Sequence, residues 1–482
     1  MLDTGSRSPF ALTQADSERV AARVELALRR ARRSGTQTLA TVSVALPSDL
    51  DPSAVVCASR RAGERWFVFE QPARGRSALS GLGEAIGLQA AGRQRFSAVA
   101  ERWRELAGAA VGDGPADPDS GGPVAVGGFA FAPDGGGAPH WQGFEPGSLS
   151  VPEVMLTRTE RDGACSVHLR LSVLTSADDL ADELLERLAR RLSELRTEPL
   201  ALLDPAPAGR FLFAGAMPPE HYEAAVSRAV ELIGAGDIEK IVLAREVQVH
   251  APLQYSPAAV FGVLREEFPS CFVFCIGRGD AAFVAASPEL LVRREGQRVS
   301  TMALAGSTRR SADPAVDDHL GEQLLRDESY RQEHAIVARR IERALHPRSV
   351  WVAAAPEPTL VKIANIQHLA TPIRAQLASP IDALELAGLL HPTSAVAGEP
   401  LSRAAPLIPA LEGLDRGWYS GPVGWTDATG DGEFCVALRC ALLRGAVARC
   451  YAGNGIVRGS DPSQELAETE VKLSALLPLL AA

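Results

Sequence analysis

The segment from Asp461 to Lys472 places charged side chains at helical spacing behind a well-marked helix start. Asp461 can cap the helix, and Pro462 suits its first position. At about 100° per residue, Glu465, Glu468 and Lys472 fall on one face. Burying two carboxylates and an ammonium without partners is costly, and a hard cation with an anionic ligand would satisfy them. The alternative is an ordinary solvated helix face.

The run Ala452–Val457, just before this helix, is apolar and interrupted by Gly453 and Gly455. Glycine in a strand allows a ligand or another backbone to approach closely. The run therefore favours a binding site over a solvated face.

Lys240 lies in Ile238–Arg245, whose β-branched residues predict a strand with two largely apolar faces, typical of the centre of a sheet. Lys240 is therefore expected to be partly buried. Desolvation lowers the pKa of a lysine and can make it a general base. The alternative is a surface lysine whose stem alone is buried.

Glu289 lies in a second predicted strand, Phe283–Arg293, which Pro288 interrupts with a bulge or bend. Apolar residues follow it, and such surroundings raise the pKa of a carboxyl group, as a general acid requires. The alternative is a glutamate on an edge strand.

Two further stretches could bind an anion. Val299–Gly306 is predicted as a strand that leads into a loop, 305–310, whose backbone N–H groups could hold a carboxylate. Glu433–Leu443 alternates as a single strand and places Arg439 among small side chains, where its fork could bind a carboxylate. A surface arginine is the alternative.

The remaining pattern predicts a mixed α/β protein with antiparallel strands. A linker over 199–209 divides it into a variable N-terminal part, 1–210, and a core, 211–482. A loop is predicted over 112–123. The predicted helices are 15–34, Arg95–Ala110, Ala177–Thr197, Pro219–Ile233 and Leu320–Leu345. The other predicted strands are Thr38–Val44, Ala54–Ala58, Trp66–Gln71, Val124–Phe131, Val151–Arg158, Cys165–Leu174 and 365–372.

Bulk properties exclude several classes of function. The 482 residues carry a net charge of −10, which argues against a nucleic-acid partner. The seven cysteines form no CxxC motif, and scattered cysteines of this kind are typical of the reducing cytoplasm. The first residues show no apolar signal-peptide region, and no apolar run is long enough for a membrane span.

Taken together, the motifs resemble those of the chorismate-utilising enzyme family, which includes isochorismate synthases, salicylate synthases and the large subunits of anthranilate and aminodeoxychorismate synthases. The resemblance covers Phe211 to Leu477. Eight blocks in order carry it: Lys240 in EKIVLAR, Ala286–Glu289, Ala305–Ser307, Glu333-His334, His368–Pro372, Arg439, Gly453–Ile456 and Glu468–Leu473.

Within the family, the chain resembles isochorismate synthases most. His391–Val396 follows their pattern, with Ala395 where aminating and salicylate-forming relatives usually carry threonine. Gly398–Leu401 lacks the lysine that ends this motif in those relatives, and Asn454 stands where many relatives have alanine. A salicylate synthase and a paralogue that binds chorismate without turnover are the alternatives.

The resemblance implies a fold of two large antiparallel sheets packed together with helices outside, so that the linker over 199–209 would be internal to one large domain that includes 1–210. It also implies Mg²⁺ held by Glu333 and Glu468, with Glu465 nearby. Lys240 would take a proton from water attacking C2 of chorismate, and Glu289 would protonate the departing C4 hydroxyl. The other residues implied to bind substrate are Gly306, Ser307, His368, Ala395, Arg439, Gly453 and Lys472. The product would feed menaquinone or siderophore synthesis, and the family favours a monomer.

Overall fold

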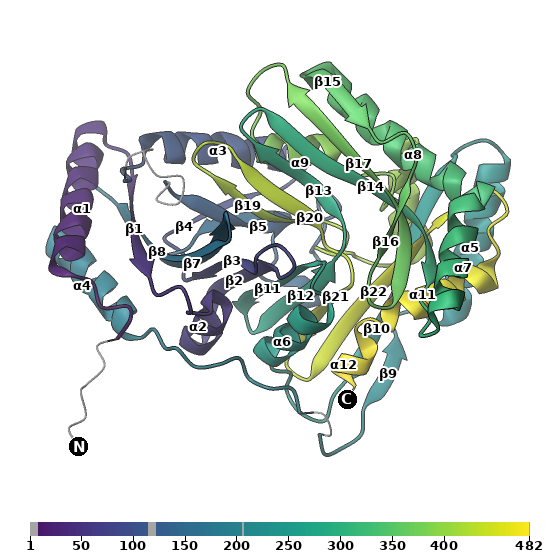
Figure 1. The fold of residues 1–482 in the computed structure, drawn as a ribbon, viewed down its shortest axis with the longest axis horizontal. Coiled ribbons are helices and arrows are strands. Elements are labelled where there is room, and N and C mark those ends of the chain that lie inside the picture. The colour runs from purple at the N-terminus through teal and green to yellow at the C-terminus, as the bar shows by residue number, and fades with distance from the viewer. Residues whose placement is uncertain (1–7, 114–121, 205–206, 482) are drawn as a thin grey trace.

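The computed structural model describes residues 8–113, 122–204 and 207–481. Two large antiparallel β-sheets face each other, and helices cover their outer faces (Figure 1). The predicted fold class is therefore confirmed. Parts of three predictions lie outside the described residues. They are residues 1–7, to which the predicted absence of a signal peptide refers, 114–121 of the predicted loop and 205–206 of the predicted linker.

The first sheet has twelve strands. Its order is β1 (Thr38–Leu46), β8 (Ala164–Thr175), β7 (Val154–Arg161), β3 (Ser77–Leu82), β2 (Gly63–Gln71), β11 (Phe272–Gly279), β12 (Ala281–Ser287), β21 (Cys440–Arg444), β22 (Val447–Ile456), β10 (Lys240–His250) and β18 (Gly398–Glu399), and β9 (Leu212–Gly215) also pairs with β10.

The second sheet has ten strands. Its order is β15 (Ser349–Ala354), β17 (Ile366–Leu377), β14 (Arg298–Arg309), β13 (Leu290–Glu295), β20 (Gly432–Val436), β19 (Pro422–Asp427), β5 (Val124–Phe129), β6 (Gly147–Val151) and β4 (Ile86–Ala90), and β16 (Thr359–Lys362) also pairs with β17. Strands from before and after residue 210 pair within both sheets, as β2 with β11 and β5 with β19.

The helices pack on the outer faces of the two sheets. Those against the twelve-stranded sheet are α1 (Gln14–Ser34), α2 (Pro52–Ser59), α5 (Pro219–Gly234), α6 (Pro257–Glu267), α10 (Leu401–Glu412) and α11 (Pro462–Leu473). Those against the ten-stranded sheet are α3 (Arg95–Ala109), α7 (Pro314–Arg326), α8 (Glu328–Leu345) and α9 (Ala383–Leu390). Two more, α4 (Ala181–Ser193) and α12 (Leu477–Leu480), pack on α1 and α6.

An aromatic core joins the sheets. It combines side chains of the first sheet, such as Phe69, Phe274 and Phe283, with Val126 and Val423 of the second. All five are buried. Burying one such side chain contributes roughly 1.5–3 kcal/mol, so this layer fixes the distance between the sheets.

Most predicted elements are confirmed, including the pairing of β7 with β8. Two predictions near helix starts are wrong. Residues 54–58 belong to α2, because Asp51 caps a helix there by accepting the N–H groups of Ser53 and Ala54. The single helix predicted over Leu320–Leu345 is two helices, because Asp327 ends α7 and caps α8.

Two strand predictions and one loop prediction also need correction. Phe283–Arg293 and Glu433–Leu443 are not continuous strands, because each is divided between the two sheets, as β12 with β13 and as β21 with β20. Period-2 alternation is the same in both sheets, so it does not reveal where a chain crosses. The predicted loop 305–310 lies largely within β14, which is bulged between Ala305 and Ser307.

β10 lies near one end of its sheet rather than at its centre. It still has partners on both edges, β22 on one side and β9 and β18 on the other. Helices α5 and α10 also pack on it. This enclosure explains why Lys240 is fully buried, more completely than its sequence predicted.

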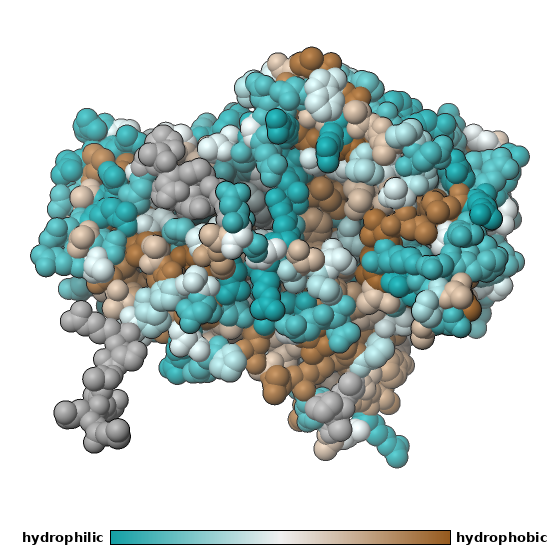
Figure 2. Space-filling view, viewed as in Figure 1, coloured by the Kyte–Doolittle hydropathy of each residue, from teal (hydrophilic) through white to brown (hydrophobic). Residues whose placement is uncertain are grey.

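Across the described ranges, no helix is long and apolar enough to cross a membrane. Figure 2 shows polar residues over much of one face, with apolar residues gathered at its lower edge, where α6, α12 and β9 lie. The seven cysteines are free thiols.

A buried ion pair between Glu412 and Arg416 connects the end of α10 to β10 and to the segment before β18. Glu412 accepts the Ala244 N–H at 2.7 Å, and Arg416 donates to the Val242 and Val396 carbonyls. Removing one partner of a buried pair leaves an uncompensated charge.

We therefore expect Glu412→Ala to lower the free energy of unfolding by about 3–5 kcal/mol, measured by urea denaturation. The control is Glu231→Ala, which breaks the exposed pair with Arg228 and should change stability by about 1 kcal/mol or less. Equal midpoints for Glu412→Ala and the wild type would show that the buried pair does not stabilise the fold.

Candidate active site

A cavity of ≈ 260 Å³ opens between the ends of β10, β14, β17 and β22 and the helices α8 and α11. Every predicted site residue lines it except Lys240. Lys240 lies directly behind the lining, against Glu333 and Gly455. The tertiary structure thus brings the whole predicted set together.

Helix α11 presents its charged face to this cavity, as predicted. Asp461 caps the helix by accepting the N–H groups of Ser463 and Gln464. Glu468 lies 2.8 Å from Lys472 Nζ and accepts a hydrogen bond from Ser307 Oγ, also at 2.8 Å. The alternative of a solvated face is therefore excluded.

The two α11 carboxylates that line the cavity, Glu465 and Glu468, have opposite electrostatic surroundings. Burial alone would raise the pKa of Glu468, but Lys472 and Ser307 outweigh it and hold that pKa below its usual value. Burial, reinforced by the negative charge of Glu468, raises the pKa of Glu465 to about 7. At neutral pH the carboxyl group of Glu465 is therefore partly protonated.

Lys240 lies beside Gly455 of β22, where it pairs with Glu333. Its Nζ lies 2.8 Å from Glu333 Oε1. A Cβ atom on Gly455 would clash with Glu333 and lie 2.6 Å from Lys240 Cε. At Gly455 the absence of a side chain therefore lets β22 pass beside the ion pair, whereas the approach to a ligand predicted for this run stays a prediction.

Glu289 and Arg439 lie where the chain crosses between the sheets. Glu289 follows β12, and Arg439, with φ of +49°, precedes β21. The crossings are joined by two hydrogen bonds, from Val436 N–H to Glu289 O and from Ala286 N–H to Arg439 O. The alternation predicted that Arg439 lies on the face of one continuous strand. This prediction is wrong, because Arg439 lies between β20 and β21.

Burial raises the pKa of Glu289 to about 8, although the positive charges of Lys240 and Arg439 lower it. Burial, together with the charges of Arg439 and Lys472, holds the pKa of His368 well below its usual value. At neutral pH the site therefore holds a protonated carboxyl group and a neutral imidazole. His368 Nε2 lies 3.4 Å from Arg439 Nη2 and can accept its hydrogen bond.

The backbone around the cavity is shaped by the β14 bulge. Gly306 has φ of +74°, and Tyr330 packs over it, so that a Cβ atom at Gly306 would lie 3.3 Å from Tyr330 Cβ. Ala395 lines the cavity from the segment before β18. Gly453 offers its carbonyl to Lys472 at 3.1 Å.

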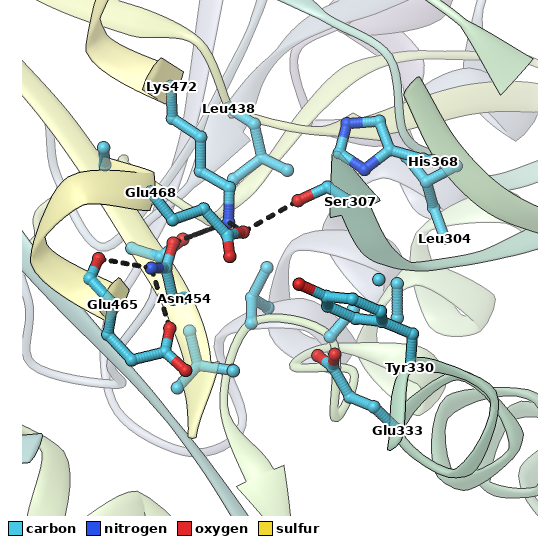
Figure 3. Close-up of a pocket in the computed structure, with 18 of the residues that line it drawn as sticks. Leu304, Ser307, Tyr330, Glu333, His368, Leu438, Asn454, Glu465, Glu468 and Lys472 are labelled. Carbon is cyan, nitrogen blue, oxygen red and sulfur yellow. Dashed lines mark hydrogen bonds and ion pairs between the residues drawn. The ribbon is translucent and has the colours of Figure 1, made fainter. Parts of the chain in front are cut away.

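Tyr330 and Asn454 are two of the lining residues that were not among those predicted to act in the site. Tyr330 lies three residues before Glu333 on α8, so helical spacing alone could have placed both on one face. Asn454 donates to Glu465 and accepts from Lys472 (Figure 3). No spacing rule would have found this contact, because it joins a strand to a helix.

The acidic groups at the cavity are of the chemical type that binds a hard divalent cation. Burial, with the charges of Glu468, Glu465 and Glu333, raises the pKa of Tyr330 to about 12, so all three carboxylates act on one hydroxyl. Carboxylate oxygens are the ligands that Mg²⁺ prefers. Within the described residues, no three acidic, histidine or cysteine side chains yet stand close enough to share an ion. Two of these carboxylates are instead paired with Lys240 and Lys472.

Known proteins share this architecture. The chain is 39% identical over 415 residues to the salicylate biosynthesis isochorismate synthase of Pseudomonas aeruginosa, covering 86% of this chain and 84% of that protein. It is 35% identical over 361 residues to the isochorismate synthase MenF of Bacillus subtilis, covering 74% and 75%.

Among solved structures, MenF, the menaquinone-specific isochorismate synthase from Escherichia coli, superimposes with a TM-score of 0.77 at 26% identity, over 95% of this chain and 99% of that one. Anthranilate synthase component I from Streptococcus pneumoniae shares the fold, with a TM-score of 0.62 at 23% identity, over 76% of this chain and 82% of that one.

The family model described as chorismate binding enzyme matches residues 26–481. The match extends well before Phe211, where the motif resemblance began. Because it spans nearly the whole sequence, the chain belongs to the chorismate binding enzyme family, as its motifs predicted.

Proposed function

We propose that this protein is an isochorismate synthase that converts chorismate reversibly to isochorismate with Mg²⁺. The observation that carries the proposal is that two buried residues, Glu289 and Lys240, both lie at a cavity lined by three further carboxylates. The names of the relatives support it.

Chorismate is a dicarboxylate, so the site must supply positive charge and N–H donors. Arg439 is half-buried and lines the cavity, where a planar carboxylate could meet its guanidinium. The bulged backbone at Gly306 and Ser307 and the strand at Gly453 line the cavity, where substrate carboxylates could meet them. His368, held neutral, would orient polar groups of the ring.

Glu333 and Glu468, with Glu465 nearby, would hold Mg²⁺. When bound, the ion supplies Lewis-acid stabilisation of the ring carboxylate. Glu333 also pairs with Lys240 in the structure. The base role of Lys240 requires that Glu333 find another partner, as it would within such a carboxylate set.

The proton transfers fall to two residues from different strands. Lys240 Nζ would accept a proton from the water that attacks C2. Glu289 is protonated at neutral pH because its pKa is about 8, so it can donate to the departing C4 hydroxyl. A carboxyl group with an ordinary pKa would have lost that proton.

We further propose that the protein acts as a monomer in the cytoplasm and supplies menaquinone or siderophore synthesis. Light scattering after size exclusion tests the monomer, and metabolite analysis of a deletion strain tests the pathway. A mass of twice 51.0 kDa would contradict the first.

The product distinguishes the candidate functions. Chorismate incubated with the protein should give isochorismate in equilibrium with chorismate, only when Mg²⁺ is present, as followed by chromatography. Salicylate with pyruvate would show a salicylate synthase instead, which Ala395 disfavours. Bound but unchanged chorismate would show a binding paralogue.

Replacing Lys240 with methionine removes the amine and keeps the stem. We expect turnover to fall by roughly 10²–10⁴-fold, with Mg²⁺-dependent chorismate binding retained in calorimetry. The control, Lys362→Met, changes a lysine that pairs with Asp317 and Asp318 away from the cavity, and should keep wild-type turnover. Wild-type turnover by Lys240→Met would refute the base role.

The pKa of Glu289 predicts the alkaline limb of the pH profile. Because the protonated form is the donor, kcat/KM should fall as pH rises through about 8. Glu289→Gln cannot supply the proton and should lose roughly 10²–10⁴-fold in turnover. Infrared difference spectra should show a protonated carboxyl band that titrates in the same range and is absent in Glu289→Gln. A profile that stays flat to high pH would refute the acid role.

A further inference from the structure

Asn454 is a buried amide whose hydrogen bonds all go to charged residues of the site or their backbone. It lies on β22 and is 2% exposed. Its Nδ2 donates to Glu465 O at 2.7 Å and to Glu465 Oε2 at 2.9 Å. Its Oδ1 accepts from Lys472 Nζ at 2.6 Å. Figure 3 shows the amide between the two side chains.

The chemistry of the partners determines the orientation of this amide. An ammonium can only donate, and a carbonyl or an ionised carboxylate can only accept. Rotating the Asn454 amide by 180° would therefore break its bonds to both Lys472 and Glu465. The amide acts as a two-ended bridge from β22 to α11.

Lys472 is the second element of the bridge. Three acceptors surround its Nζ: Gly453 O at 3.1 Å, Asn454 Oδ1 at 2.6 Å and Glu468 Oε1 at 2.8 Å. An ammonium has three N–H donors, so each has an acceptor within the protein. In this arrangement Lys472 holds protein groups together and has no donor left for a substrate carboxylate.

Glu468 extends the chain of contacts to the other sheet. Its Oε1 accepts from Ser307 on β14. One connected path therefore runs from Glu465 through Asn454, Lys472 and Glu468 to Ser307. Free glutamate and lysine side chains lose rotamer freedom when they are ordered, and this path orders them before any ligand arrives.

We propose that Asn454 is a positioning residue that fixes the Glu465 carboxylate and the Lys472 ammonium relative to each other, so that Glu465 and Glu468 face the cavity ready to bind a divalent cation. The identity of the cation as Mg²⁺ rests on the proposed function. The bridge itself rests on the contacts of Asn454.

The test is a direct titration of Mg²⁺ by calorimetry into the chorismate-free protein. Asn454→Ala should raise the Kd for Mg²⁺ by roughly tenfold or more, as the loss of an outer partner of a ligand does. At saturating Mg²⁺ its kcat should change far less than its Mg²⁺ requirement. The control, Cys450→Ala, changes a buried residue on the same face of β22 that lines no part of the cavity, and should keep the wild-type Kd.

Two further variants show whether Asn454 acts through Glu465. Asn454→Asp keeps an acceptor for Lys472 but turns an oxygen towards Glu465, so it should bind Mg²⁺ more weakly than Asn454→Ala. Aspartate differs little in size from asparagine, so Asn454→Asp still tests the proposal if Asn454→Ala does not fold. In a Glu465→Gln background, Asn454→Ala should add little to the loss of affinity.

Wild-type Mg²⁺ affinity in both Asn454 variants would overturn the inference, and so would a full additive loss in the Glu465→Gln background. Absence of Mg²⁺ binding to the wild-type protein would overturn it too. A wild-type protein that binds Mg²⁺ but makes no isochorismate would refute the proposed function alone, because the titration does not depend on turnover.

Discussion

Two adjacent chain crossings between the sheets are the constraint on which the site depends. β12 passes into β13 through Pro288 and Glu289, and β20 passes into β21 through Arg439. Backbone hydrogen bonds join the two crossings, so neither can move without the other. Because the crossings lie between two packed layers, the Glu289 side chain is removed from water, and this burial raises its pKa. Arg439 is half-buried and lines the cavity.

Charge is balanced pairwise around the cavity, once between two elements and once within a single helix. Lys240 of β10 meets Glu333 of α8, and Lys472 faces Glu468 one turn earlier on α11. Glu465 lacks a cation of its own and is held by the Asn454 amide. Buried charges persist only when they are compensated. Counting Arg439, three cations stand against the three carboxylates Glu333, Glu465 and Glu468 at the cavity, so neither sign of charge is in surplus.

Glycine makes these contacts possible at two positions. At Gly455 a side chain would clash with Glu333 and crowd Lys240, so β22 can pass beside the ion pair only without a Cβ atom. At Gly306 the positive φ forms the bulge that brings Ser307 to Glu468. The family relationship accounts for the fold, whereas the close contacts at Gly455 and Gly306 determine how the charged groups of the site are arranged.

The sequence alone determined the local structure and the inventory of chemical groups. Caps and spacing were enough to predict α11 and its charged face, and the motif order identified the family. It did not reveal that Phe283–Arg293 and Glu433–Leu443 each divide between two sheets, because alternation has the same period in either sheet. The bridge of Asn454 to Glu465 and Lys472 was equally hidden, because it joins residues of a strand and a helix that only folding brings together. Sequence thus determined which groups are present, and tertiary packing decided their burial, their partners and hence their pKa values.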